Sequence, residues 1–416
     1  MAQRIISVIL LIIIITAATV QAKKEENYKL EKILILSRHN VRAPLSESIK
    51  EITPHKWYEW KEKAGELSQK GGLLETALGQ YFNKYLVNEG FMRQNYIPEE
   101  GEFRFYANSF QRTIATAQYF ASGILPVGNV KIEHKYGVNE SDPTFLSTLE
   151  IEKTTEEYKR RAAEEYEKMG GEKNLGEKLR FESELVAKVI DLKESEAAKK
   201  KGLNKFTAED FKMEKHYIVK GKLRNAMAAS DALVLQYYEQ GNSLKAAFGH
   251  KLSAADWKRI AGVDYFGINA LYELPTLSTV LSRPLLEVMR DELELKNRRF
   301  TFLCGHDINI ATVLSALGVE NYTAPNSIES KTPIGVKIVI EKRRGKDGRE
   351  YAAVNLVYQS TQQILNVETL SLENPPMILP LKFKNLQMNE DGLYLFSDFE
   401  KLLNSTIDKY ELLIKK

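Results

Sequence analysis

Three short segments of this chain carry side chains suited to phosphoryl transfer. The first is Arg38-His39-Asn40-Val41-Arg42, in which a histidine lies between two arginines. Two guanidinium groups can hold a phosphate by paired, charge-assisted hydrogen bonds, and an imidazole between them can act as a nucleophile. A surface loop with a few charges is the simpler interpretation. The second arginine, the following Pro44 and the apolar run before the segment argue against it.

The other two segments add a third arginine, Arg112, and the pair His306-Asp307. Alone, Arg112 fits a helix surface and His306-Asp307 fits a helix cap. Phosphoryl transfer needs positive donors for three oxygens, an in-line nucleophile and an acid for the leaving oxygen. These roles fall to the donors Arg38, Arg42, Arg112 and His306, the nucleophile His39 and the acid Asp307. A helix N-terminus lowers the pKa of Asp307 and a bound phosphate raises it, so its protonation state stays open.

The scheme predicts no metal and no cofactor, because arginines and His306 already supply positive donors. The six histidines show no metal-ligand spacing, such as two at i, i+4 on a helix. We interpret His55, His134, His216 and His250 as surface or satisfied histidines.

The elements that must position these side chains are buried parallel strands. Apolar runs predict strands at Ile33–Leu36, Phe103–Ala107 and Arg299–Leu303, each followed directly by one of the three segments. Helices are predicted after the last two strands, one capped by Ser109 and one at Ile308–Leu317. Because the carboxyl ends of parallel strands meet at one sheet edge, the three segments should converge there.

The remaining pattern completes an α/β core with a helical middle. A helix is predicted over 67–86, a half-exposed strand over 336–340, and a hairpin turn at Asp347-Gly348 before a strand over 351–358. From about 148 to 203 Glu and Lys dominate a helical pattern, which continues through 223–238 and 254–260. Because both signs are interspersed, we interpret this charge as a solvated helix face rather than a binding surface.

The start of the chain predicts export. Arg4, the apolar run Ile5–Ile15 and Val20-Gln21-Ala22 together predict a signal peptide over 1–22, with an uncleaved anchor as the alternative. The mature protein is expected in the periplasm or outside the cell, with no stable membrane span. A net charge of +3 gives no argument for a nucleic-acid or membrane partner. The single cysteine, Cys304, excludes an intramolecular disulfide and fits a buried, inert thiol.

The pattern Arg-His-x-x-Arg-x-Pro with a distant His-Asp resembles the histidine acid phosphatases. With Asn40 where most of that family has glycine, the chain is most similar to the bacterial periplasmic glucose-1-phosphatases. Further stretches are similar to that subfamily: 56–60, 71–75, 142–145, 235–239, 332–335 and 357–360. The resemblance implies a three-layer, phosphoglycerate-mutase-like α/β core with an inserted all-α domain. The catalytic domain would comprise 23–145 and 285–416, and the insertion 146–284.

The resemblance also implies a function. A phosphohistidine would form on His39, with phosphate bound by Arg38, Arg42, Arg112 and His306 and a proton given by Asp307. Substrates would be small phosphomonoesters, above all sugar phosphates such as glucose 1-phosphate, and Glu239 would contact the sugar. A phytase-like inositol phosphate phosphatase is one alternative, and an exported phosphosugar-binding protein without turnover is another. Secreted members of the family usually carry disulfides, which this chain cannot form.

Overall fold

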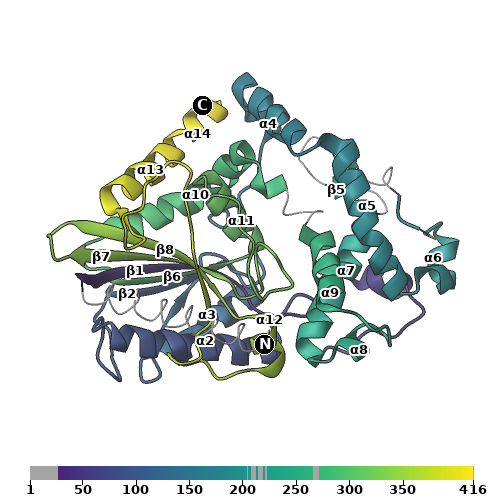
Figure 1. The fold of residues 1–416 in the computed structure, drawn as a ribbon, viewed down its shortest axis with the longest axis horizontal. Helices are drawn as coiled ribbons and strands as arrows, with labels where there is room; N and C mark the ends of the chain where they lie inside the picture. Colours follow the sequence, from purple (N-terminus) through teal and green to yellow (C-terminus); the bar gives the residue numbers. More distant parts are fainter. Residues whose placement is uncertain are drawn as a thin grey trace, which may run out of the picture.

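A computed structural model describes residues 27–203, 205–207, 212–213, 219–220, 223–265 and 271–415. The predicted signal peptide and His216 lie outside these ranges. The centre of the fold is an eight-stranded sheet of order β10-β8-β7-β1-β6-β2-β3, with β9 paired to β8 (Figure 1). The strands are β1 (Tyr28–Arg38), β2 (Phe103–Ala107), β3 (Ile132–Glu133), β6 (Phe300–Gly305), β7 (Lys337–Gly345), β8 (Glu350–Tyr358), β9 (Met377–Pro380) and β10 (Tyr394–Leu395).

The three strands predicted before the polar segments are neighbours and parallel. β6 lies between β1 and β2, and Leu303 of β6 pairs in register with Leu36 on one side and Tyr106 on the other. The prediction that their carboxyl ends share one edge is therefore confirmed. The other half of the sheet is antiparallel, and Gly348 takes a left-handed φ of 77° in the predicted hairpin turn between β7 and β8.

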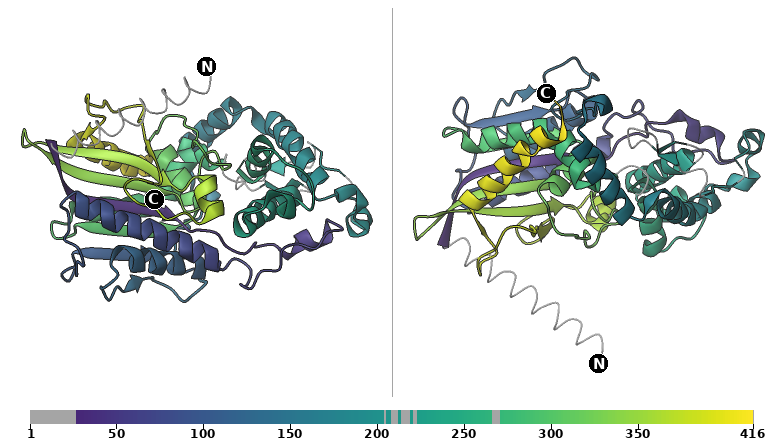
Figure 2. Two further views of the ribbon diagram at one scale, coloured as in Figure 1. Left: turned by 60° about the horizontal axis from the view of Figure 1, so that its bottom comes forward. Right: turned by 90° about the horizontal axis from the view of Figure 1, so that it is seen from above.

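Helices cover both faces of the sheet, which confirms the three-layer α/β prediction (Figures 1 and 2). One layer contains α2 (Gln69–Asn88) and α3 (Gln111–Ile124); the other contains α10 (Pro275–Glu294), α11 (Asp307–Ala316) and α13 (Phe396–Asp408). Alternate residues of β1 enter the two cores, as a period of two requires. Ile35 belongs to the core that includes Phe120 of α3, and Leu36 to the core that includes Met289 of α10.

Two local predictions were wrong. Ser109 does not cap α3: the N-cap is Phe110, and the Ser109 hydroxyl accepts a hydrogen bond from the Tyr136 amide instead. The strand at 336–340 is not half-exposed. β7 lies inside the sheet between β1 and β8, so even Lys337 is fully buried, where it pairs with Glu75.

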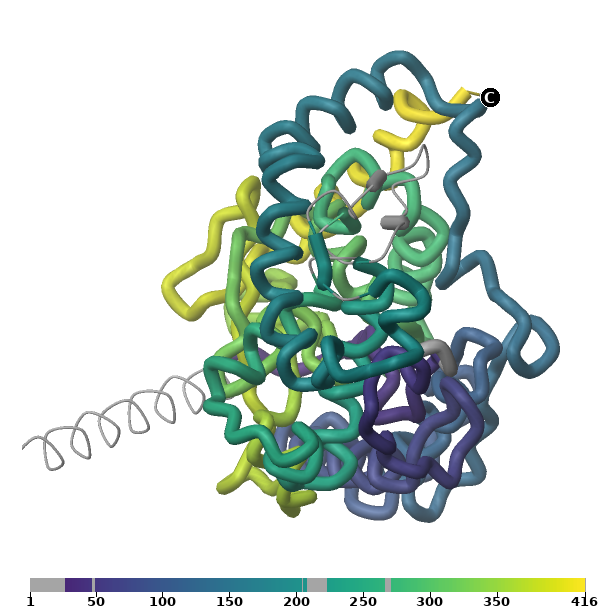
Figure 3. Tube along the Cα trace, turned by 90° about the vertical axis from the view of Figure 1, so that its right-hand side faces the viewer, coloured from purple at the N-terminus to yellow at the C-terminus, as the bar shows by residue number. Residues whose placement is uncertain are grey.

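The middle of the chain folds into a helical region (Figure 3). It has a second hydrophobic core, to which Val41, Leu74 and Ile334 of the sheet region also contribute. Its helices are α4 (Glu156–Lys168), α5 (Gly171–Val189), α6 (Glu196–Lys200), α7 (Leu223–Gln240), α8 (Ser243–Ala246) and α9 (Ala254–Asp264). A two-stranded pair of β4 (Lys212–Met213) and β5 (Val219–Lys220) interrupts the otherwise helical pattern. The charged faces carry exposed ion pairs within one helix, such as Arg160 with Glu157 and Glu164, as a solvated face should.

α10 connects the two cores. Its Leu277 packs in the helical core, whereas Leu286 packs in the sheet core, and Pro284 lies between them inside the helix. The domain boundaries near 145 and 284 stay predictions. α12 (Thr361–Asn366) and α14 (Tyr410–Leu413) complete the helices. In the ranges that the structure describes, no helix combines the length and the apolar character needed to cross a membrane. Cys304 is fully buried on β6, which raises the pKa of its thiol.

Candidate active site

The carboxyl ends of β1, β6 and β2 bring the three polar segments together. The His39 amide donates to the Gly305 carbonyl at 3.0 Å, and the Asn108 amide donates to the Cys304 carbonyl at 2.9 Å. Adjacent strand ends are thus joined by backbone hydrogen bonds directly below the polar side chains. The side chains are fixed in position by the sheet itself rather than by mobile loops.

His39 is held as a neutral imidazole with one free nitrogen lone pair. Its Nδ1 lies 2.9 Å from the Asn40 carbonyl oxygen, which can only accept, so Nδ1 carries the proton and Nε2 does not. The side chain is buried, and burial lowers the pKa of His39 well below its usual value. Nearby positive charge, first of all Arg112, lowers that pKa further. A neutral Nε2 is the form that can attack phosphorus.

His306 faces the same space as a hydrogen-bond donor. The Asn108 carboxamide oxygen accepts from the Ser109 and Asp142 amides, so its NH₂ group must donate to His306 Nε2, at 2.7 Å. Because burial and then Arg112 lower the pKa of His306 to about 3, the ring is neutral and its proton sits on Nδ1. That Nδ1 lies 3.4 Å from Arg112 Nη2. Two donors that face each other in this way define a position for an anion.

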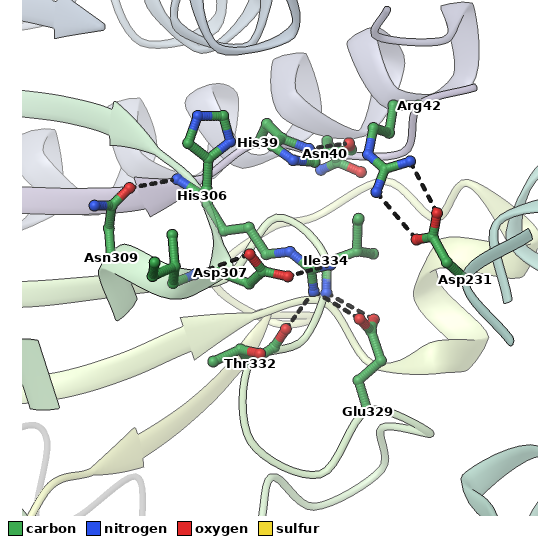
Figure 4. Close-up of polar contacts among 12 residues, drawn as sticks. His39, Asn40, Arg42, Asp231, His306, Asp307, Asn309, Glu329, Thr332 and Ile334 are labelled. Carbon is green, nitrogen blue, oxygen red and sulfur yellow. Dashed lines mark hydrogen bonds and ion pairs between the residues drawn. The ribbon is translucent and has the colours of Figure 1, made fainter. Parts of the chain in front are cut away.

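Arg38 is aligned by the carboxylate of Glu329 and the carbonyl of Thr332, both of which Figure 4 labels. Its Nη1 donates to Glu329 Oε1 at 2.6 Å and to the Thr332 carbonyl. Glu329 is itself fixed, because its Oε2 accepts from the Ile334 amide at 2.8 Å and from the Tyr238 hydroxyl at 3.0 Å. Among the residues that the structure describes, the buried Nε of Arg38 has no hydrogen-bond partner, as expected of a guanidinium that has donors available for a ligand.

Asp307 begins α11 and is partly exposed. Its Oδ1 accepts from the Ile308 amide at 2.8 Å, and its Oδ2 lies 3.5 Å from Arg38 Nη2. Burial acts to raise the pKa of this carboxyl, but the charge of Arg38 and the Ile308 amide help to lower it below its ordinary value. Without substrate, therefore, Asp307 is a carboxylate near neutral pH.

Arg42 points toward the helical region. Both terminal nitrogens bind Asp231 of α7, at 3.0 and 3.1 Å, in a bidentate ion pair. A second acid from this region, Asp264 at the end of α9, has its pKa raised far above the ordinary value by burial and then by the charges of Asp231 and Asp307. Two acidic residues of the helical region thus lie close to the arginines of the sheet.

The structure brings together all predicted residues of the site except Glu239. The Glu239 carboxylate accepts from the Ser68 hydroxyl at 2.7 Å, and Ser68 caps α2 by accepting from the Gly71 amide. Burial raises the pKa of Glu239. Its assignment as a sugar contact stays a prediction.

Sequence reasoning missed Asp231, Glu329 and the role of Asn108. Asp231 and Glu329 contact arginines that are 189 and 291 residues away in the chain, and no local pattern marks such partners. Asn108 did have a signal, since it lies directly between β2 and the start of α3, the helix that carries Arg112. Within the described ranges, no three metal-ligating side chains gather at this site.

Comparison with known proteins agrees with this geometry. Residues 29–359 match the model of the histidine phosphatase superfamily (branch 2). The chain belongs to that superfamily.

Individual relatives cover nearly all of the chain. It is 29% identical to a glucose-1-phosphatase of Salmonella typhimurium over 97% of this chain and 99% of that one. It is 30% identical to a glucose-1-phosphatase of Providencia rettgeri over 91% and 92%. Among solved structures, the Hafnia alvei phytase superposes with a TM-score of 0.82 at 23% identity, covering 91% of this chain and 97% of that one.

Proposed function

We propose that this protein hydrolyses sugar phosphates such as glucose 1-phosphate through a phosphohistidine on His39. The chain is a phosphomonoester hydrolase of the histidine phosphatase superfamily, and curated relatives at 29–30% identity are named glucose-1-phosphatases. The observation that carries the proposal is the fixed tautomer of His39, whose unprotonated Nε2 shares one small space with guanidinium and imidazole donors.

In the first half-reaction, His39 Nε2 attacks phosphorus and the bond from phosphorus to the sugar oxygen breaks. Arg38, Arg42, Arg112 and the Nδ1–H of His306 donate to the non-bridging oxygens, which carry the developing charge. A sugar alkoxide is a poor leaving group, so Asp307 gives it a proton. The carboxyl takes that proton with the arriving substrate, because a bound phosphate raises its pKa.

In the second half-reaction, water attacks the phosphohistidine. Asp307, now a carboxylate, takes a proton from that water, and the phosphorus–nitrogen bond breaks. His39 returns to its neutral form as phosphate leaves. One carboxyl serves both steps, because the leaving oxygen and the attacking water approach phosphorus from the same side, opposite His39.

The carboxylates beside the site favour a substrate with a single phosphate. Asp231 and Glu329 already pair with two of the arginines. Further phosphates of an inositol phosphate would meet these acids, whereas sugar hydroxyls can donate to them. A phytase-like activity is the second candidate, favoured by the structural similarity to phytases.

The proposal also covers the location of the protein, its ligands and its domain organisation. We infer export to the periplasm or beyond after removal of 1–22, small phosphomonoesters as the only ligands of the site, and a catalytic domain split by a helical insertion. Secretion of the full chain by a bacterial host, with N-terminal sequencing of the product, tests the first.

The decisive experiment is a panel of kcat/KM values for glucose 1-phosphate, glucose 6-phosphate and phytate. We expect the highest kcat/KM for glucose 1-phosphate and the lowest for phytate. Phosphate release from phytate at a higher kcat/KM would establish the second candidate. Binding of glucose 1-phosphate without any release of phosphate would instead identify a phosphosugar-binding protein.

A further inference from the structure

A cluster of two histidines and one aspartate lies apart from the catalytic residues. His55 Nε2 is 2.6 Å from Asp191 Oδ2, and His250 Nε2 is 3.1 Å from the same oxygen. One ligand atom from each of the three side chains lies within 4.8 Å of the other two. The residues come from three segments: the stretch after η1 (Glu47–Glu51), the end of α5, and the turn between α8 and α9.

We propose that His55, Asp191 and His250 form a binding site for a zinc-like divalent cation that ties the segment after the catalytic loop to the helical region. Two imidazoles and a carboxylate are a donor set that Zn²⁺ accepts, with water in the fourth position. The proposal adds a structural metal to the molecule and leaves the phosphatase chemistry free of metal.

The two nitrogen–oxygen distances are close to those that a metal requires. Zinc bonds of about 2.0–2.1 Å in tetrahedral geometry place ligand atoms about 3.3 Å apart. The two nitrogen–oxygen distances are 2.6 and 3.1 Å, so each need lengthen only by part of an ångström when the ion enters. Each imidazole then carries its proton on Nδ1, because the Nε2 lone pair binds the metal.

The ligands are held in place by neighbouring groups. The His55 ring stacks on Phe248, with centroids 4.7 Å apart, and Trp57 packs edge-on against the same phenylalanine. The hydroxyl of Thr53 donates to the Ile190 carbonyl at 2.7 Å, next to Asp191 in the chain. Such surroundings orient the candidate metal ligands.

Two backbone conformations at the cluster are uncommon. Asp191 has a φ of 47° and Phe248 a φ of 51°, both in the left-handed region that side chains with a Cβ disfavour. For a phenylalanine this conformation carries strain, and such strain concentrates at sites that bind ligands. The three ligand side chains remain 24–30% exposed, which leaves room for a bound water and a path for the ion.

The site also has a simpler interpretation, a hydrogen-bonded triad in which Asp191 only accepts from two imidazoles. The test therefore uses full-length protein without a histidine tag, freed of metal by a chelator and then titrated with Zn²⁺. We expect one equivalent to bind and the thermal midpoint to rise. With Co²⁺ in place of zinc, a tetrahedral absorption spectrum should appear.

Variants locate the ion. Asp191→Asn and His250→Gln keep groups that can hydrogen-bond but bind zinc poorly, so each should weaken zinc binding about 100-fold or more while the metal-free midpoint stays near that of the wild type. His134→Ala is the matched control, because this exposed histidine lies outside the cluster and contacts the Tyr136 carbonyl two residues away. It should bind zinc like the wild type.

Three outcomes would overturn the proposal: no bound equivalent of zinc, unchanged binding in Asp191→Asn and His250→Gln, or zinc that competes with phosphate at the catalytic histidines. Phosphatase activity is a separate readout, and we expect it to persist in the chelated enzyme. If zinc does not bind at this cluster, the proposed phosphatase function is unaffected. If the phosphatase function is wrong, the metal site can still be tested by the thermal midpoint and the Co²⁺ spectrum.

Discussion

Asp307→Asn should separate substrates by the quality of their leaving groups. The asparagine oxygen can still accept from the Ile308 amide, so the start of α11 is preserved. What is lost is the proton for the leaving oxygen and one negative charge 3.5 Å from Arg38. Nitrophenol leaves from phosphorus with little help, whereas a sugar needs the proton.

The two losses have different sizes. A missing general acid costs about 10²–10⁴-fold in rate, and this applies to glucose 1-phosphate alone. A partly exposed ion pair is worth about 0.2–1 kcal/mol, so its loss changes both substrates alike, by about fivefold or less. Because the ion-pair loss is common to both substrates, it cancels in their ratio. We therefore expect phosphorylation of His39 to slow by at least about 100-fold more with glucose 1-phosphate than with p-nitrophenyl phosphate.

The assay is single-turnover kinetics with enzyme in excess. Steady-state rates hide the effect, because Asp307 also activates water in the second half-reaction, which both substrates share. The variant should release nitrophenol in a burst, while glucose release lags far behind the wild type. Equal slowing of both first steps would refute the reasoning and leave Asp307 as an electrostatic or structural residue.

The same carboxyl predicts a pH dependence. The pKa of Asp307 in the free enzyme lies below the ordinary value of 3.8, so the proton-bearing form becomes scarcer as pH rises above that pKa. Wild-type kcat/KM for glucose 1-phosphate should therefore fall toward neutral pH more steeply than that for p-nitrophenyl phosphate. In Asp307→Asn, which has no proton to lose, the two profiles should run parallel.

Three further predictions test the remaining parts of the site. His39→Ala should lower kcat by several orders of magnitude in a folded protein, and acid-quenched wild type should hold phosphate on His39 and on no serine. A chelator should leave phosphatase activity unchanged; activity that vanishes and returns with one divalent metal would count against the scheme. Glu239→Ala should lower kcat/KM for glucose 1-phosphate more than for an aryl phosphate. The difference in activation free energy should be about 1.5–3 kcal/mol. Equal changes would mean that Glu239 only supports the cap of α2 through Ser68.

The parts of the fold that lie closest to the chemistry were predictable because they are strongly patterned. Continuous apolar runs mark β1, β2 and β6, and a polar segment follows each run directly. Once three strands are parallel and adjacent, the meeting of Arg38, Arg112 and His306 follows from sheet geometry alone. Arginines and histidines gathered at one point then indicate phosphate binding and phosphoryl transfer.

What could not be predicted depends on distant partners. Asp231 and Glu329 hold two arginines in place, yet each looks in the sequence like any acid on a helix or in a loop. The burial of β7 depends on β8 and β1 on its two sides, which alternation in one strand cannot reveal. The His55 cluster was missed for the same reason, since Asp191 is 136 residues away.

The buried pair behind the catalytic loop connects core packing to the chemistry. Glu75 and Lys337 are both fully buried 2.9 Å apart, and Glu75 also accepts from the Asn40 side chain at 2.8 Å. Removing one partner of such a pair leaves a buried charge without a counter-ion. This lowers the free energy of unfolding by about 3–5 kcal/mol. Asn40 is also the residue whose carbonyl fixes the tautomer of His39. The state of the nucleophile therefore depends on an ion pair that touches no substrate, and its geometry is set where β1, β7 and α2 pack together.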